Sequence, residues 1–180
     1  DWMGGFGKTS RSFWRKLRKG GVDVRCHNPP NFLDPLGIFS RDHRKCLVID
    51  GATAFVSGLC VGRDWVGNPE KGIEPWRDTG IVLNGPAVAD AEAAFAQVWQ
   101  TAGSPLERER LSHRQGIDPA GEIRVRVVQS VPSAAHIYRM DQLLAAFARK
   151  TIWLTDAYFM GTPAFLDSMK AAATDRKSVV

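Results

Sequence analysis

The sequence lacks the features that would assign it to several common classes of protein. It has no run of about 18 apolar residues, so no part of it is expected to span a membrane. Its three cysteines, Cys26, Cys46 and Cys60, are widely spaced and form no C-x-x-C pair. This spacing argues against a disulfide framework or a zinc site and favours a reducing compartment. The cysteines are expected to be small buried apolar side chains.

Acidic residues are also in a minority, 19 against 24 lysines and arginines. This modest basic excess suits an anionic partner, such as a phospholipid surface or nucleic acid, but does not decide between them. The remaining composition is that of a globular protein, 44% hydrophobic and 24% charged over 180 residues. That length allows one domain or parts of two.

Apolar periodicity and turn residues predict alternating strands and helices. The helix expected over 10–19 carries five lysines and arginines outside an apolar stripe. These basic residues are interpreted either as a membrane-surface or phosphate-facing patch, or as a solvated face. The other expected helices cover 86–100, 138–150 and 163–173, and strands are expected over 22–26, 46–49, 54–56, 81–83, 123–127 and 151–155.

The residues best suited to chemistry lie between Ser40 and Gly51, where His43, Lys45 and Asp50 follow the pattern H-x-K-x4-D. Residues 46–49 are a short apolar run closed by Asp50-Gly51, which is typical of a buried strand ending in a tight turn. Because side chains alternate along a strand, His43 and Lys45 are expected to project from the same face at its entrance.

A histidine beside a lysine is a poor metal site but a good phosphate site. The lysine can balance phosphate charge, and the histidine can act as nucleophile or proton carrier near neutral pH. His27, His113 and His136 have no such context and are expected to be ordinary surface or packed side chains.

The residues around this motif are similar to those of the phospholipase D superfamily. The stretch from Arg41 to Lys45, followed by Val48-Ile49-Asp50-Gly51, resembles the first H-x-K-x4-D motif of the superfamily, and most of all that of bacterial cardiolipin synthase-like phosphatidyltransferases. The resemblance implies an α/β fold, with a mixed β-sheet flanked by helices in a phospholipase D-like α-β-α sandwich, truncated at both ends. The likeness continues in family order through Pro75-Trp76-Arg77-Asp78-Thr79, Gly85-Pro86-Ala87-Val88 with Phe95 and Trp99, and Asp156-Ala157-Tyr158-Phe159.

The resemblance also implies phosphate-binding residues after the second strand of the motif. The family carries there a Gly-Gly/Ser-x-Asn signature, whose small residues let backbone and hydroxyl groups approach phosphate. Ser57 and Gly58 keep the small residues, whereas Cys60 stands where the family has its Asn donor. One phosphate donor is therefore in doubt, although the His-Lys pair is not.

Two aspartates complete the expected site. The family places an acidic residue after its downstream Trp, which makes Asp78 the candidate to hold the His43 imidazole in one tautomer. A surface ion pair between Asp78 and Arg77 or another base is the alternative. Asp50 belongs to the motif and is expected to hold the turn rather than touch substrate.

Four segments are expected along the chain. Residues 1–103 form most of the first phospholipase D-like half, residues 104–121 a linker, and residues 122–174 the start of the second half. Residues 175–180 are interpreted as a sequencing-adapter artefact, because GAT-CGG-AAG-AGC-GTC-GTG, a nucleotide string encoding them, resembles a common adapter. The chain is expected to begin in mid-domain, with any membrane anchor upstream, and to take its second catalytic motif from a missing C-terminal half or a homodimer partner.

The resemblance implies phosphatidyl transfer between phospholipids through a phosphohistidine intermediate, without metal or cofactor. The expected partners are an anionic phospholipid or other phosphodiester and a membrane surface, and the expected place is the bacterial inner membrane, on the cytoplasmic side or peripheral. Hydrolysis by a phospholipase D or nuclease-type enzyme is the alternative, because water can replace the acceptor alcohol. A non-catalytic phosphate-binding remnant is the alternative of another class, since one motif and Cys60 leave the site incomplete.

Overall fold

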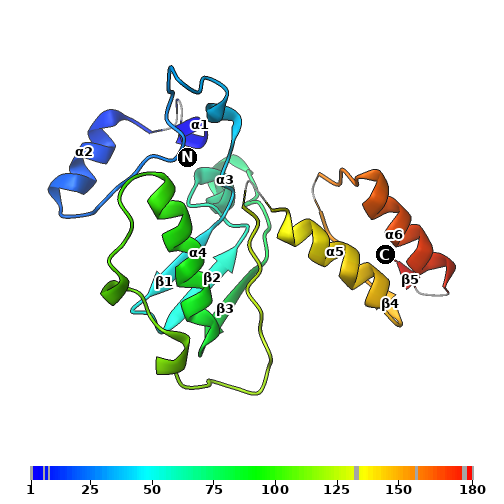
Figure 1. Cartoon of the computed structure of the whole chain (residues 1–180). Helices are drawn as coiled ribbons and strands as arrows, with labels where there is room; N and C mark the ends of the chain where they lie inside the picture. Colours follow the sequence, from blue (N-terminus) through cyan, green and yellow to red (C-terminus); the bar gives the residue numbers. More distant parts are fainter. Residues whose placement is uncertain are drawn as a thin grey trace. The chain divides into compact units, whose positions relative to one another are not determined.

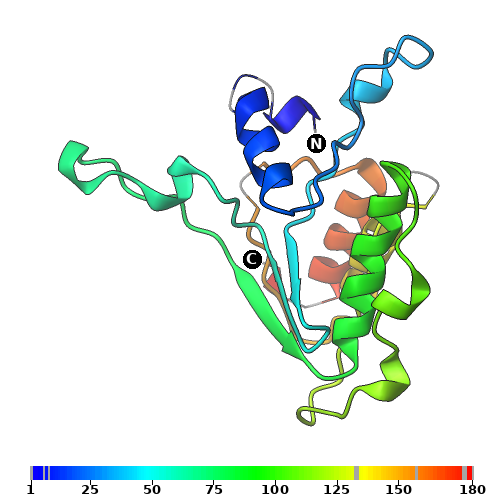
Figure 2. The ribbon, with the colours of Figure 1, turned by 90° about the vertical axis from the view of Figure 1, so that its left-hand side faces the viewer.

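The computed structural model describes residues 2–5, 7, 9–131, 134–156, 158–175 and 178–179, without the side chains of Phe39, Ser178 and Val179. The chain divides into two compact units, Asp1–Val127 and Val128–Val180. Each unit is described by itself (Figure 1, Figure 2).

The first unit is built on an antiparallel sheet of three strands in the order β1-β2-β3. The β1–β2 hairpin turns at Asp50 and Gly51, which both have positive φ (53° and 61°), and the Ala52 N–H donates to the Ile49 carbonyl at 3.0 Å. Such a turn matches the twist of the flanking strands, so the turn predicted from Asp50-Gly51 is confirmed. The strands are β1 (Cys46–Ile49), β2 (Thr53–Ser57) and β3 (Gly80–Asn84).

One face of this sheet is covered by helix α4 (Ala87–Thr101), as Figure 1 shows. Ala54, Leu83, Val88 and Ala91 form the buried core between them. The opposite face is open in the first unit: Leu47, Phe55 and Val82 are 57%, 40% and 57% exposed. The expectation that residues 46–49 form a buried strand is therefore wrong, because a helix covers only one face of the sheet.

Val88 is the largest completely buried side chain among the described residues, at 0% exposure. Val88→Ala is expected to lower the free energy of unfolding by about 2 kcal/mol, since it removes two buried carbon atoms and leaves a cavity. Urea unfolding of the variant measures the loss. Val61→Ala, at a fully exposed valine (105%), is the matched control and should change nothing; a loss under about 0.5 kcal/mol for Val88→Ala would contradict the packing.

The basic N-terminal helix forms as predicted. Helix α2 spans Arg11–Lys19 and is capped by Ser10, whose hydroxyl accepts from the Phe13 N–H at 3.2 Å. The short helix α1 (Trp2–Gly5) precedes it. In Figures 1 and 2 both helices lie beyond the end of the three-stranded sheet at which β1 begins.

Two predicted strands are not formed. Residues 22–26 and 123–127 are both outside helix and strand, and neither edge of the described three-stranded sheet pairs with them. In residues 22–26 the backbone carbonyl of Val24 instead accepts from Arg18 at 3.0 Å. In residues 123–127 Ile123 is 88% exposed, whereas Val127 packs against the core. Alternating apolar residues alone do not make a strand without a partner edge.

Residues 104–121, predicted to be a linker, pack along α4 as part of the first unit. The Arg114 guanidinium lies 2.7 Å from the Asp90 carboxylate, and the Ser112 N–H donates to Glu92. Arg114 and the Ser112 backbone thus pair with acidic side chains of α4. Short elements complete the first unit: α3 (Arg63–Val66) and 3₁₀ turns η1 (Gly37–Phe39), η2 (Pro69–Lys71), η3 (Arg108–Arg110) and η4 (Arg114–Gly116).

The second unit pairs helix α5 (His136–Phe147) with helix α6 (Pro163–Thr174). Thr162 caps α6, and its hydroxyl is 2.6 Å from the Tyr138 hydroxyl of α5. Strand β4 (Thr151–Ile152), shorter than predicted, pairs in parallel with β5 (Ser178–Val179). The adapter origin of residues 175–180 stays a prediction.

The mixed α/β class predicted from the sequence is confirmed. The second helical layer of the expected α-β-α sandwich stays a prediction, as do the boundaries of the two family halves. Among the described residues, no helix has both the length and the apolar character needed to cross a bilayer.

Candidate active site

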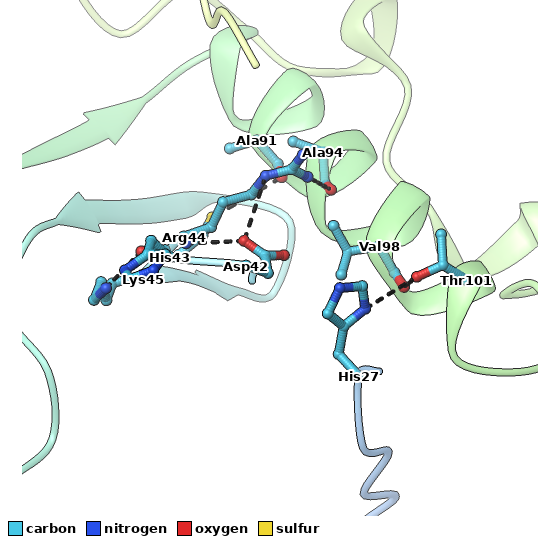
Figure 3. Close-up of polar contacts among 10 residues, drawn as sticks. His27, Asp42, His43, Arg44, Lys45, Ala91, Ala94, Val98 and Thr101 are labelled. Carbon is cyan, nitrogen blue, oxygen red and sulfur yellow. Dashed lines mark hydrogen bonds and ion pairs between the residues drawn. The ribbon is translucent and has the colours of Figure 1, made fainter. Parts of the chain in front are cut away.

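The residues that lead into β1 alternate between two sides, and one side is fixed to α4. The Arg44 guanidinium donates to the Ala94 carbonyl at 3.0 Å and lies 3.7 Å from the Asp42 carboxylate (Figure 3). Two residues on, the Cys46 sulfur lies 3.9 Å from the Ala91 carbonyl. Asp42, Arg44 and Cys46 therefore anchor this segment to the helix, a role that the sequence analysis did not foresee.

His43 and Lys45 lie on the other side of the same segment. Figure 3 shows their side chains next to each other and directed away from α4. The His43 side chain is exposed, and the Lys45 ammonium donates to the His43 backbone carbonyl at 2.6 Å. The predicted shared face is confirmed, and the imidazole is open to an incoming ligand.

Ser57 lies across the sheet from Lys45. Its backbone N–H donates to the Lys45 carbonyl at 3.1 Å, and it pairs with Gly80 of β3. Because Ala54 faces α4, the strand period places Ser57 on the opposite face, together with Lys45. The structure thus brings together the predicted residues Lys45 and Ser57, with Gly58 next in the chain, at the end of the sheet where β1 begins.

Asp78 lies near Gly58 but is not bonded to His43. Its carboxylate accepts from the Trp65 indole N–H at 3.3 Å and from the Thr79 N–H at 2.8 Å. A Cβ on Gly58 would collide with the same carboxylate, so a larger residue there would force the Asp78 side chain to move. Within the described part of the chain, no hydrogen bond joins Asp78 to the imidazole. The orienting contact expected from the sequence is therefore not found, and neither is the alternative ion pair with Arg77.

Asp78→Asn tests whether this carboxylate has a role in catalysis. Asparagine keeps an oxygen for the Thr79 N–H, so we expect turnover within about threefold of wild type and a loss of about 1 kcal/mol or less in stability. Steady-state turnover on phosphatidylglycerol, measured in a protein of the relatives' length that carries this chain, is the readout. A fall in turnover of a hundredfold or more, about 2.7 kcal/mol, would restore the orienting role.

Asp50 and Cys60 do not join the pair either. Asp50 stands in the hairpin turn at the other end of β1, which agrees with the expected role in the turn. The Cys60 sulfur lies 3.9 Å from the Gly58 carbonyl. The family's Asn donor therefore has no amide counterpart at this position.

On the α4 side, a cavity of about 260 Å³ lies between the helix and the segment leading into β1. Arg44 and His27 line it, and the His27 ring nitrogen is 3.3 Å from the Thr101 hydroxyl (Figure 3). Burial raises the pKa of the Cys46 thiol, and the Arg44 guanidinium partly offsets that rise. A thiol with a raised pKa stays neutral at neutral pH, so Cys46 is a packing residue rather than a nucleophile.

Comparison with known proteins identifies similar sequences. Cardiolipin synthase A of Pseudomonas aeruginosa is 32% identical over 162 residues, covering 87% of this chain and 32% of the relative. Cardiolipin synthase 2 of Bacillus anthracis is 33% identical over 185 aligned positions, covering 96% of this chain and 34% of the relative. Cardiolipin synthase of Alkalihalophilus pseudofirmus is 31% identical over 172 residues, covering 92% of this chain and 34% of the relative. No protein-family model matches, and no solved structure matches.

The H-x-K-x4-D motif on an α/β fold and these relatives define a protein of the phospholipase D superfamily. Within it the chain is cardiolipin synthase-like, as the resemblance predicted. The chain spans about a third of the length of the curated relatives that it matches.

Proposed function

We propose that this chain contributes one catalytic motif to an enzyme that transfers a phosphatidyl group between phospholipids. The observation that carries the proposal is the pair His43 and Lys45, side by side on a face that α4 leaves open. Similarity to cardiolipin synthases of three bacteria supports phosphatidylglycerol as donor and acceptor.

The chemistry follows from the two side chains. Lys45 pairs with a phosphoryl oxygen and balances the charge that develops there. His43 either attacks phosphorus, which breaks the bond to the leaving glycerol oxygen and leaves a phosphohistidine, or donates the proton that the leaving alkoxide takes. The Ser57 hydroxyl, at the same end of the sheet as Lys45, can make a second phosphoryl contact, whereas the Gly58 N–H already donates to the Thr79 carbonyl at 3.3 Å. An acceptor alcohol then takes the phosphatidyl group and regenerates the imidazole.

A second histidine is needed because one cannot be nucleophile and proton donor to the same leaving group. We propose that it comes from a second H-x-K-x4-D motif, either elsewhere in a longer protein or in a partner copy. This enzyme acts at the surface of a membrane that contains anionic phospholipid. Metal ions take no part in the step, so turnover should persist in EDTA.

Product analysis tests the proposal. A protein of the relatives' length that carries this chain is incubated with labelled phosphatidylglycerol in EDTA. Cardiolipin and glycerol in equal amounts are the expected products. Phosphatidic acid instead would identify a hydrolase, cleavage of nucleic acid alone would identify a nuclease, and no phosphodiester consumption would identify a phosphate-binding remnant.

A further inference from the structure

A groove of about 870 Å³ lies between α1, α2 and the segment that follows α2. Neither His43 nor Lys45 lines it. Its wall combines cationic and aromatic side chains: Arg11, Arg15 and Arg18 of α2, with Trp2, Trp14 and Val24.

The three arginines form one stripe. They are spaced i, i+4 and i+7, so they lie on the same face of α2. Arg18 is held in place by its hydrogen bond to the Val24 carbonyl, 3.0 Å long. Arg11 and Arg15 are exposed and form no ion pair with any residue that the structure describes. The sequence from Trp2 to Val22 also contains no acidic residue, although Asp1 and Asp23 flank it, so this stretch is strongly basic and suits an anionic ligand.

The aromatic residues give the groove an apolar side. The Trp14 indole donates to the Thr9 hydroxyl at 3.2 Å, and its ring meets Phe13 edge-on at 4.9 Å. Trp2 of α1 also lines the groove, whereas Phe13 lies on another face of α2 and does not. Arginine binds phosphate through two parallel hydrogen bonds, and tryptophan suits the boundary between head groups and acyl chains.

We propose that this groove binds the phosphate head group of an anionic phospholipid, with α2 lying at the bilayer surface. The inference concerns membrane docking rather than catalysis, and it rests on the proposed function for the choice of a phospholipid over a nucleic acid. Guanidinium groups of Arg11 and Arg15 hold the phosphate, while Trp2 and Trp14 contact the glycerol and upper acyl carbons.

Vesicle co-sedimentation of the 180-residue chain tests it, with phosphatidylcholine vesicles that either contain or lack phosphatidylglycerol. Arg11→Gln with Arg15→Gln removes two charges from the groove. Lys16→Gln with Lys19→Gln removes two charges from the same helix outside the groove, and is the matched control. We expect the arginine pair to weaken binding to phosphatidylglycerol vesicles at least about tenfold more than the lysine pair, because a purely diffuse charge effect would weaken both equally.

Equal losses in the two variants would overturn the groove and leave a diffuse basic face. Failure of the wild-type chain to bind phosphatidylglycerol vesicles would overturn the membrane partner. Tighter binding to single-stranded DNA or RNA, with a loss of binding confined to the arginine variant, would identify the ligand as a nucleic acid instead of a lipid.

A second experiment on the wild-type chain applies if circular dichroism shows that the arginine variant misfolds. Phenylglyoxal modifies exposed arginines, and short-chain phosphatidylglycerol should protect Arg11 and Arg15 from it. Protection supports the groove, and its absence overturns it. Vesicle binding is measured without turnover, so a failure of docking and a failure of catalysis are distinguishable.

Discussion

His43→Asn is expected to lower phosphatidyl transfer by about a thousandfold or more in a protein of the relatives' length that carries this chain. Asparagine keeps a polar side chain of similar size but can neither attack phosphorus nor carry the proton at neutral pH. Because the His43 side chain is exposed and its ring forms no hydrogen bond to a described residue, replacing it should leave the fold unchanged. Cardiolipin formed per minute from phosphatidylglycerol is the measurement.

His113→Asn is the matched control, since His113 is also exposed but lies in the segment packed along α4. It should keep wild-type turnover. If His43→Asn retained more than about a tenth of the activity, the imidazole would not be part of the chemistry, because general acid–base or nucleophilic roles contribute at least about a hundredfold.

Lys45→Met carries the second large expected effect, a fall of about a hundredfold or more in kcat/KM. Methionine fills the space of the lysine stem, so the hairpin should keep its stability while the phosphoryl oxygen loses its cation. The Lys45 ammonium already bonds the His43 carbonyl, so the substitution also frees the backbone beside the imidazole. Steady-state kinetics on phosphatidylglycerol gives the change.

Two further variants test whether the effect of Lys45→Met comes from the loss of its charge at this position. Lys45→Arg keeps the charge and should recover part of the loss, although a guanidinium does not place its charge where an ammonium does. Lys71→Met, at an exposed lysine of η2, should leave kcat/KM unchanged. An effect of Lys45→Met no larger than that of Lys71→Met would rule out the phosphate-binding role.

Local signals predicted much of the fold. Ser10 and the apolar stripe after it predict α2, the apolar stripe of Val88 and Ala91 predicts α4, and Asp50-Gly51 predicts the hairpin. Each of these depends on residues a few positions apart in the sequence. The strands predicted over 22–26 and 123–127 do not form, because pairing depends on how distant segments meet, which no local pattern specifies.

The candidate site also combines features that the sequence predicts with features that it does not. His43 and Lys45 share a face because of the strand period, which the sequence shows directly. The bonds from Arg44 to Ala94 and from Trp65 to Asp78 depend on how separate segments meet. The position of Asp78 after its tryptophan pointed to an orienting carboxylate, whereas its carboxylate is used to hold the loop beside Gly58.

The covalent step is the central claim, and mass spectrometry of the working enzyme tests it most directly. The enzyme is mixed with phosphatidylglycerol, quenched at alkaline pH to preserve the acid-labile phosphorus–nitrogen bond, and digested. We expect a phosphatidyl adduct on one histidine of an H-x-K-x4-D motif. If His43 is the nucleophile, the peptide containing residues 41–50 carries the adduct and His43→Asn abolishes it. If His43 is the proton donor, the adduct lies on the partner histidine. A turning-over enzyme in which no histidine carries phosphorus would contradict the phosphohistidine mechanism.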